Sequence, residues 1–313
     1  MFRLHQVVAF VRLGRPLFLV GGFVFYGLGA AIAAYLGGAR AGGGAIDWRR
    51  FAWGQAAITA MHLMTHYCND YFDFAADRAN ATPTRWSGGS RVLPGGELSP
   101  VVALLAALVL AVLACVATAI AVLHAGAPST AVPLLLATIV FAWEYSAPPL
   151  RLHSTGWGEL DVALVVAGLT PAVGFYLQAE QWRLLPLLAL APLGALQFAM
   201  LLSIEFPDAA GDAAAGKRTL VVRLGAERAA ALYQAVVAAA YLALPLLVAA
   251  GLPLIVAGAA LLTSPIAVFQ IARMRRGAFR DPARWESLAF WTVALLTGTA
   301  VAELAAFVFA PRL

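Results

Sequence analysis

Charge is scarce in this sequence. Only 12% of the 313 residues are charged, whereas 62% are hydrophobic. Soluble domains usually carry about a quarter charged residues, so a secreted, disordered or nucleic-acid-binding chain is disfavoured. Cys68 and Cys115 are the two cysteines and both lie in apolar runs, which leaves no disulfide framework for a small extracellular fold. The composition indicates an integral membrane protein.

Nine apolar stretches approach the roughly 20 residues that a helix needs to cross a bilayer. They cover about 16–37, 51–70, 101–123, 131–150, 160–179, 184–206, 229–250, 252–272 and 287–309. The cut between the seventh and eighth rests on the turn Gly251-Leu252-Pro253. We expect one all-α domain over 1–313, a bundle of nine transmembrane helices. Helices 1–6 (about 12–225) carry the motifs described below, and helices 7–9 cover about 229–310.

The basic residues are divided unequally between the two faces that nine spans would create. The N-terminus and the loops after even-numbered spans hold 16 of the 21, and the other face holds Arg40, Arg49, Arg50, Arg183 and Arg312. The positive-inside rule then predicts a cytoplasmic N-terminus, which Arg3 helps to set. The polar loops 78–100 and 207–228 would share the cytoplasmic side of the cell membrane.

Two acidic segments follow the second and sixth expected helices. Each has acids at positions i, i+3 and i+7: Asp70, Asp73 and Asp77, then Glu205, Asp208 and Asp212. At about 100° per residue, each set would fall within roughly 60° on one helix face. Two facing carboxylate stripes repel each other unless cations lie between them. Mg²⁺ bound by carboxylates and by a phosphate would meet that need.

Basic residues follow both stripes. Arg78, Arg85 and Arg91 follow the first, and Lys217 and Arg218 follow the second. Arg91 ends the segment 87–91 (Ser-Gly-Gly-Ser-Arg), whose glycines allow backbone N–H groups to converge on an anion. The pattern predicts a Mg²⁺-diphosphate site at the mouth of an apolar bundle, for a substrate with a diphosphate head and a hydrocarbon tail.

Two other interpretations remain open for the acidic segments. They could be solvated helix ends whose acids balance nearby arginines. They could also belong to a cation-coupled transporter, because intramembrane acids mark ion pathways. A transporter would leave the basic loops without a role.

At these residues the chain resembles the UbiA superfamily of intramembrane prenyltransferases, nine-helix bundles with two acidic motifs. Their Asn-Asp-x-x-Asp-x-x-x-Asp pattern matches 69–77, their Asp-x-x-x-Asp pattern matches 208–212, and 215–225 is a typical continuation. The resemblance implies that Mg²⁺ and an isoprenyl diphosphate are held by Asn69, Asp73, Asp77, Asp208 and Asp212, with Asp70 and Glu205 in or beside the metal site. The acids of the two motifs, Asp70 included, would be the catalytic residues.

A further segment, 145–152, matches family members where the chain approaches the diphosphate. By this resemblance Tyr145 and Ser146 would contact the diphosphate and Arg151 would assist them. Alternatively, Pro148 and Pro149 simply end a helix.

Within the family, residues 69–73, 174–178 and 212–220 most resemble the dihydroxynaphthoate prenyltransferases of menaquinone synthesis. Residues 87–91 and 205–208 depart from the commoner form of that branch. The resemblance implies transfer of a polyprenyl group from its diphosphate to an aromatic acid. A hydroxybenzoate-like acceptor and cyclisation of the prenyl diphosphate without any acceptor are the alternatives.

His62 and His66 lie one turn apart on the helix face that carries Asn69 and Asp73. They could line an acceptor pocket, form a hydrogen-bonded pair inside the bundle, or bind zinc, although the glutamate of a zincin motif is missing. Gln197 and Arg15 are weaker pocket candidates, and Arg15 could equally be a topology anchor.

Overall fold

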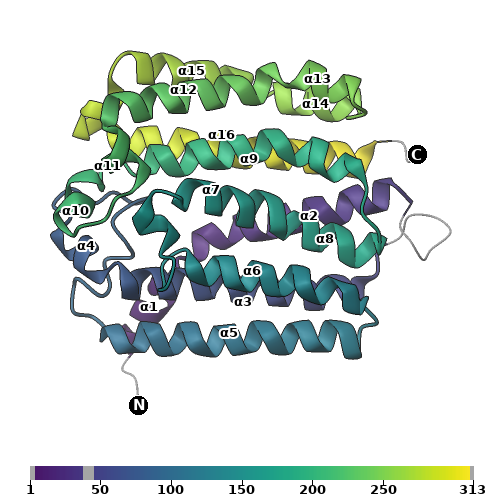
Figure 1. Ribbon diagram of the computed structural model, residues 1–313, viewed down its shortest axis with the longest axis horizontal. Coiled ribbons are helices and arrows are strands. Elements are labelled where there is room, and N and C mark those ends of the chain that lie inside the picture. The colour runs from purple at the N-terminus through teal and green to yellow at the C-terminus, as the bar shows by residue number, and fades with distance from the viewer. Residues whose placement is uncertain (1–3, 38–45, 311–313) are drawn as a thin grey trace.

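The computed structural model describes residues 4–37 and 46–310, and every regular element within those ranges is a helix. Most helices run along the long axis of the molecule in stacked layers, with short helices gathered at one end (Figure 1). Arg3, Arg40 and Arg312, which entered the charge count, lie outside the described residues.

The first part of the chain forms a short N-terminal helix, four longer helices and one further short helix. These are α1 (Leu4–Leu13), α2 (Leu19–Tyr35), α3 (Trp48–Phe72), α5 (Pro100–Leu123) and α6 (Val132–Glu144), with the short helix α4 (Phe74–Ala79) after α3. Arg15 lies between α1 and α2 with a left-handed φ of 45°. The chain therefore turns sharply before its first long apolar helix.

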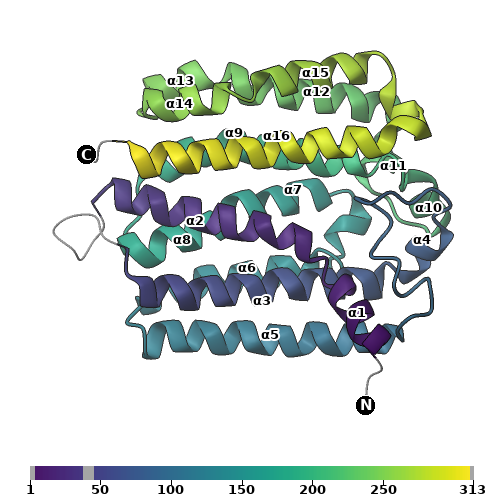
Figure 2. The same cartoon turned by 180° about the vertical axis from the view of Figure 1, so that it is seen from behind.

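The second part begins with a rod made of α7 (Gly158–Val162), the π-helical segment Ala163–Leu169 and α8 (Thr170–Ala179). It continues through α9 (Leu184–Ile204), α10 (Ala209–Ala214), α11 (Leu220–Leu224), α12 (Ala226–Leu242), α13 (Leu244–Ala249), α14 (Leu254–Leu261), α15 (Ser264–Arg275) and α16 (Pro282–Phe309). Seen from behind, the last helix, α16, lies beside α2 from the first part of the chain (Figure 2).

Six helical stretches in the described residues are long and apolar enough to cross a membrane, and the bent pair α14–α15 would be a seventh. The other two expected spans coincide with α3, which carries the polar motif, and with the shorter segment Ser129–Glu144. An all-α, polytopic membrane protein is therefore confirmed. Nine membrane crossings and a cytoplasmic N-terminus stay predictions.

Small residues let α2 and α8 cross in close contact. A Cβ atom on Gly29 would lie 1.8 Å from the Pro171 carbonyl oxygen, and one on Gly174 would lie 2.2 Å from the Tyr26 carbonyl oxygen. Membrane helices commonly use such residues because close backbone approach replaces the hydrophobic driving force that lipid removes.

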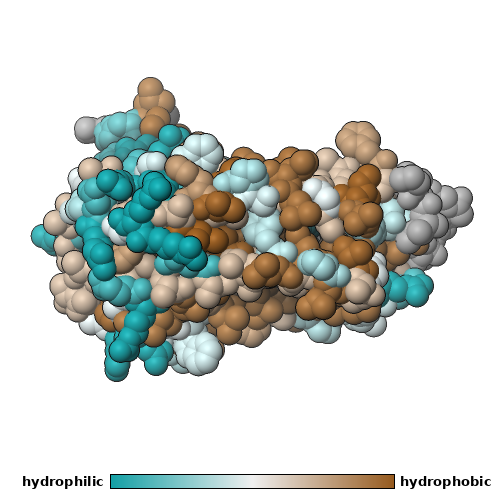
Figure 3. Space-filling model, turned by 90° about the horizontal axis from the view of Figure 1, so that it is seen from above, coloured by the Kyte–Doolittle hydropathy of each residue, from teal (hydrophilic) through white to brown (hydrophobic). Residues whose placement is uncertain are grey.

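Both acidic segments lie at the end of the bundle where hydrophilic side chains gather (Figures 1 and 3). There α4 packs against α10. The helices differ from the expected continuous stripes, because α3 is interrupted at Asp73 and α9 ends at Ile204 before α10 begins. Pro207 lacks an N–H group and disfavours helical geometry at Phe206, which accounts for the second break.

The α2–α8 crossing gives a stability test. Gly29→Ala should destabilise the protein by about 1–3 kcal/mol because the new methyl group overlaps the Pro171 carbonyl. Gly27→Ala is the matched control on the same helix, where a Cβ would meet nothing within 4 Å. Thermal unfolding in detergent measures both, and equal melting temperatures would contradict the packing described here.

Candidate active site

Lys217 joins the two acidic segments. Its Nζ atom lies 3.1 Å from Asp73 Oδ2 and 3.1 Å from Asp212 Oδ1, and all three side chains are buried. The Lys217 backbone N–H also donates to the Asp212 carbonyl at 2.8 Å, which fixes where the side chain starts. The cation between the two acidic segments in this structure is therefore an ammonium group of the chain itself.

The charges of this triad stabilise one another. Burial alone would raise the pKa of Asp73, but Lys217 and His153 outweigh it and hold that pKa well below its usual value. Burial likewise would lower the pKa of Lys217, but Asp73 and Asp212 raise it above the usual range. Asp73 therefore remains ionised beside a charged lysine.

His153 connects this triad to the segment after α6. Its Nε2 atom lies 2.6 Å from Lys217 Nζ and 3.3 Å from Asp73 Oδ2, and its Nδ1 atom lies 3.2 Å from the Tyr145 hydroxyl. The Tyr145 and His153 rings stack with centroids 4.9 Å apart. The same Nδ1 atom lies 3.6 Å from Glu205 Oε1.

Asn69 and Ser146 complete this half of the site. Asn69 Nδ2 donates to Asp73 Oδ2 at 2.6 Å and to Ser146 Oγ at 3.1 Å. The structure thus brings together six residues that the sequence singled out, namely Asn69, Asp73, Tyr145, Ser146, Asp212 and Lys217.

The loop 87–91 forms the other half of the site. Gly88 and Gly89 have left-handed φ values of +75° and +73°, and a Cβ atom on Gly89 would lie 2.0 Å from Asp77 Oδ2. The Gly88 N–H donates to Asp208 Oδ2 at 3.0 Å, and Arg91 donates to the Asp77 carbonyl. Only glycine allows the loop to lie this close to the Asp77 carboxylate.

The carboxylates of Asp77 and Asp208 are less well compensated than that of Asp73. Burial, with Asp73 and Asp70 nearby, raises the pKa of Asp77 to about 8. Burial together with Asp212 raises the pKa of Asp208 to about 6, although Asn80 Nδ2 donates to Asp208 Oδ1 at 2.7 Å. Burial and neighbouring negative charge both disfavour the ionised forms, which a bound cation would stabilise.

Asp70 faces away from the Lys217 triad. Its carboxylate pairs with Arg15 Nη2 at 2.7 Å and accepts hydrogen bonds from the backbone and side chain of Ser90. Asp70 still lies near enough to Asp77 to help raise the pKa of that carboxyl, so the expected face shared with Asp73 and Asp77 stays a prediction. Through these contacts Asp70 joins loop 87–91 to Arg15.

The remaining expected diphosphate-binding residues lie at the surface. Arg78, Arg151 and Arg218 are exposed. Arg85 is also exposed, and its guanidinium lies 5.8 Å from the centre of the Trp86 ring. The structure gathers these arginines at the polar end of the bundle without placing them among the buried carboxylates.

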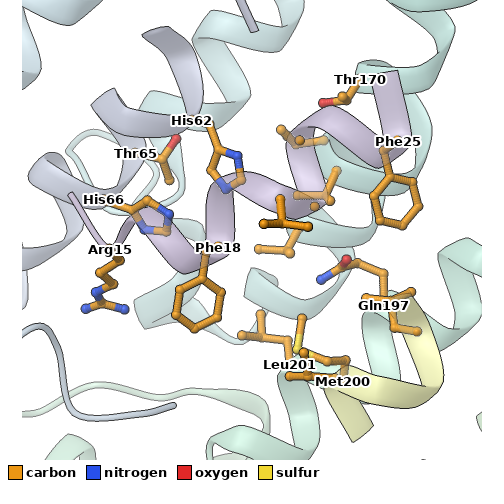
Figure 4. Close-up of a pocket in the computed structure, with 18 of the residues that line it drawn as sticks. Arg15, Phe18, Phe25, His62, Thr65, His66, Thr170, Gln197, Met200 and Leu201 are labelled. Carbon is orange, nitrogen blue, oxygen red and sulfur yellow. The ribbon is translucent and has the colours of Figure 1, made fainter. Parts of the chain in front are cut away.

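A largely apolar cavity of about 400 Å³ leads from Asn69 and Tyr145 into the bundle. Arg15, His62, His66 and Gln197 all line it, so the structure brings the four expected acceptor-pocket residues to one space. The two imidazoles stack 4.9 Å apart on α3, and Gln197 reaches the same space from α9 (Figure 4).

Three buried residues near the site escaped the sequence interpretation: His153, Glu159 and Asp161. His153 is a lone histidine after two prolines, and the two acids open the short helix α7. In the sequence, the three residues share one feature, which is that they are polar and precede a long apolar stretch. Polar residues at an ordinary membrane boundary show the same feature, so it does not indicate a functional site.

The sequence profile of the UbiA prenyltransferase family matches residues 30–302. The chain belongs to this family. Over 212 residues it is 31% identical to the 1,4-dihydroxy-2-naphthoate octaprenyltransferase of Mycobacterium tuberculosis. The aligned region covers 64% of this chain and 68% of that protein. The chain is therefore a membrane prenyltransferase.

Solved structures of UbiA homologues share the fold. The apo structure of the homologue from Aeropyrum pernix K1 matches with a TM-score of 0.67 at 18% identity, over 90% of this chain and 96% of that one. The homologue from Archaeoglobus fulgidus bound to GPP and Mg²⁺ matches with a TM-score of 0.61 at 16% identity, over 96% and 99%.

The donor set of this UbiA prenyltransferase suits a hard divalent cation, because it consists of buried carboxylates and an amide. Asn69, Asp73, Asp77, Asp208 and Asp212 could supply the oxygen ligands. Within residues 4–37 and 46–310, however, no three acidic, histidine or cysteine side chains converge on one point, because the Lys217 ammonium lies between Asp73 and Asp212.

Loop 87–91 gives a test of the site. Gly89→Ala should lower prenyl transfer roughly 10- to 100-fold, because the new methyl group would displace the loop or Asp77. Gly96→Ala controls for backbone strain, since Gly96 has a similar φ of +71° but a Cβ there meets nothing within 4 Å. Diphosphate release in detergent measures both, and equal losses would show that crowding at Asp77 is unimportant.

Proposed function

We propose that this prenyltransferase moves a polyprenyl group from an isoprenyl diphosphate to an aromatic acid, with dihydroxynaphthoate as the acceptor and Mg²⁺ as the cofactor. The observation that carries this proposal is the apolar cavity, which begins at Asn69 and Tyr145, next to the buried Asp73 carboxylate, and extends into the bundle. Such a shape suits a substrate with a charged head and a hydrocarbon tail.

The comparisons with related proteins support the proposed acceptor and the proposed isoprenyl diphosphate. The relative from Mycobacterium tuberculosis is a 1,4-dihydroxy-2-naphthoate octaprenyltransferase, and the homologue from Archaeoglobus fulgidus binds GPP and Mg²⁺. The polar residues His62, His66 and Gln197 on an otherwise apolar wall suit an aromatic ring with hydroxyl and carboxylate groups better than a pure hydrocarbon product.

Each part of the site has a task in this reaction. The carboxylates and Asn69 hold Mg²⁺, which neutralises charge on the departing diphosphate when bound. Lys217, Ser146 and the Tyr145 hydroxyl are the donors placed to orient the phosphate oxygens. The apolar walls keep water from the allylic carbon until the aromatic ring attacks it.

The tail has a route from the bilayer. Leu17, Val20 and Phe290 line the cavity and are each about half exposed, so the cavity reaches the lipid-facing surface where α2 meets α16 (Figure 2). We propose that the polar end of the bundle faces the cytoplasm in the cell membrane, where a water-soluble aromatic acid can reach it.

Mass spectrometry of products tests the function. The purified protein is incubated with labelled geranylgeranyl diphosphate, Mg²⁺ and a panel of aromatic acids. A prenylated dihydroxynaphthoate product is expected. A prenylated hydroxybenzoate would change the acceptor, and a hydrocarbon formed without any acid would indicate a cyclase. Cation flux in liposomes without diphosphate release would instead support a transporter.

The acidic residues give a mutational test. Asp73→Ala and Asp208→Ala should each lower turnover at least about 100-fold, because each removes charge that holds the metal and diphosphate. Removing Mg²⁺ from the wild-type protein with EDTA should lower turnover to the same extent, and adding Mg²⁺ back should restore wild-type turnover. Glu97→Ala is the control, since Glu97 is a partly exposed acid that pairs with Arg12. Full activity in either aspartate variant would contradict the proposed metal site.

A further inference from the structure

Asp161 is a buried acid in the wall of the cavity. It is 5% exposed and lies in α7, directly before the π-helical segment Ala163–Leu169. Its Oδ1 atom is inaccessible and accepts no hydrogen bond from any residue that the structure describes. A carboxylate oxygen left unpaired in an apolar environment is costly, so a protein that keeps one there usually uses it.

Two further polar atoms on the cavity wall are buried in the same way. His66 Nε2 and Arg15 Nε also lack a hydrogen-bond partner among the described residues. The cavity is therefore lined by three residues, Asp161, His66 and Arg15, each of which has a buried polar atom without a hydrogen-bond partner. A ligand that carries both a hydroxyl group and a carboxylate would satisfy this combination.

Other buried acids differ from Asp161 in position. Glu159 lies beside Glu205, and neither residue lines the cavity. Glu303 is buried in α16 with an unpaired Oε2 atom, but it also lies outside the cavity wall. Among these three acids, Asp161 is the one that lines the cavity where an acceptor ring would lie.

We infer that Asp161 is a catalytic residue that binds the hydroxyl group of the aromatic acceptor and takes its proton. This inference rests on the proposed function. The hydroxyl proton passes to the Asp161 carboxylate while a ring carbon forms the new bond to C1 of the prenyl chain. The C1–O bond breaks, and its electron pair leaves with the diphosphate.

The ring then regains its aromatic state. The attacked carbon loses either a proton, which passes to the departed diphosphate, or carbon dioxide, and the ring oxygen takes back the proton that Asp161 had accepted. Asp161 ends the cycle as a carboxylate, so the step consumes no further reactant. Proton transfer by a positioned side chain commonly contributes about 10²- to 10⁴-fold to a rate.

The test compares Asp161→Asn with Glu303→Gln. Both remove a buried carboxylate with little change of shape, but only the first lies on the cavity wall. Product formation from labelled geranylgeranyl diphosphate and 1,4-dihydroxy-2-naphthoate should fall roughly 100-fold in Asp161→Asn. The Kd of that variant for geranylgeranyl diphosphate should stay at the wild-type value, and Glu303→Gln should keep both properties.

Asp161→Glu provides a second variant, which should recover part of the activity because it retains a carboxylate. Wild-type turnover in Asp161→Asn would overturn the assignment, as would an equal loss of geranylgeranyl diphosphate binding. If the wild-type protein prenylates no aromatic acid, the proposed function itself fails. The two failures are therefore distinguishable in one set of assays.

Discussion

Lys217 holds together two acidic helix ends that would otherwise repel each other. Asp73 ends α3 and Asp212 lies in α10, far apart in the sequence, and the Lys217 ammonium contacts both at 3.1 Å. At such distances within a low-dielectric protein interior, attraction between opposite charges far exceeds its value in water. This contact acts together with the hydrogen bond from Asn80 to Asp208 where α10 packs on α4.

In this triad the Lys217 ammonium supplies the positive charge that neutralises Asp73 and Asp212. A diphosphate with its metal would bring several more charges to the same place. Lys217 has a long flexible side chain, so it can turn from the carboxylates toward a phosphate oxygen without moving the backbone. His153 and Tyr145 stack beside it and limit where it can go.

Hydropathy and the acidic motifs predict much of this arrangement, because membrane helices need long apolar runs and buried acids are rare. The nine expected stretches all fall on helices, and the two acidic segments lie together. Other features depend on chain reversals that no periodicity indicates. His153 reaches the site because its N–H donates to the Tyr145 carbonyl at 2.9 Å, folding the segment back after α6. Asp70 turns to Arg15 because loop 87–91 packs against it.

The opposite end of the bundle shows how this chain treats a buried charge that has a structural role. Arg50 is 1% exposed, yet its guanidinium contacts the Leu177 carbonyl at 3.2 Å, Glu180 at 2.6 Å and the Gly126 carbonyl. It ties three connections between helices together and leaves little of its charge uncompensated. Glu205 and Asp161 at the polar end have no comparable set of donors. Desolvating an unpaired carboxylate costs several kcal/mol or forces its protonation, so a bound ligand would stabilise Asp161 in a way that Arg50 does not require.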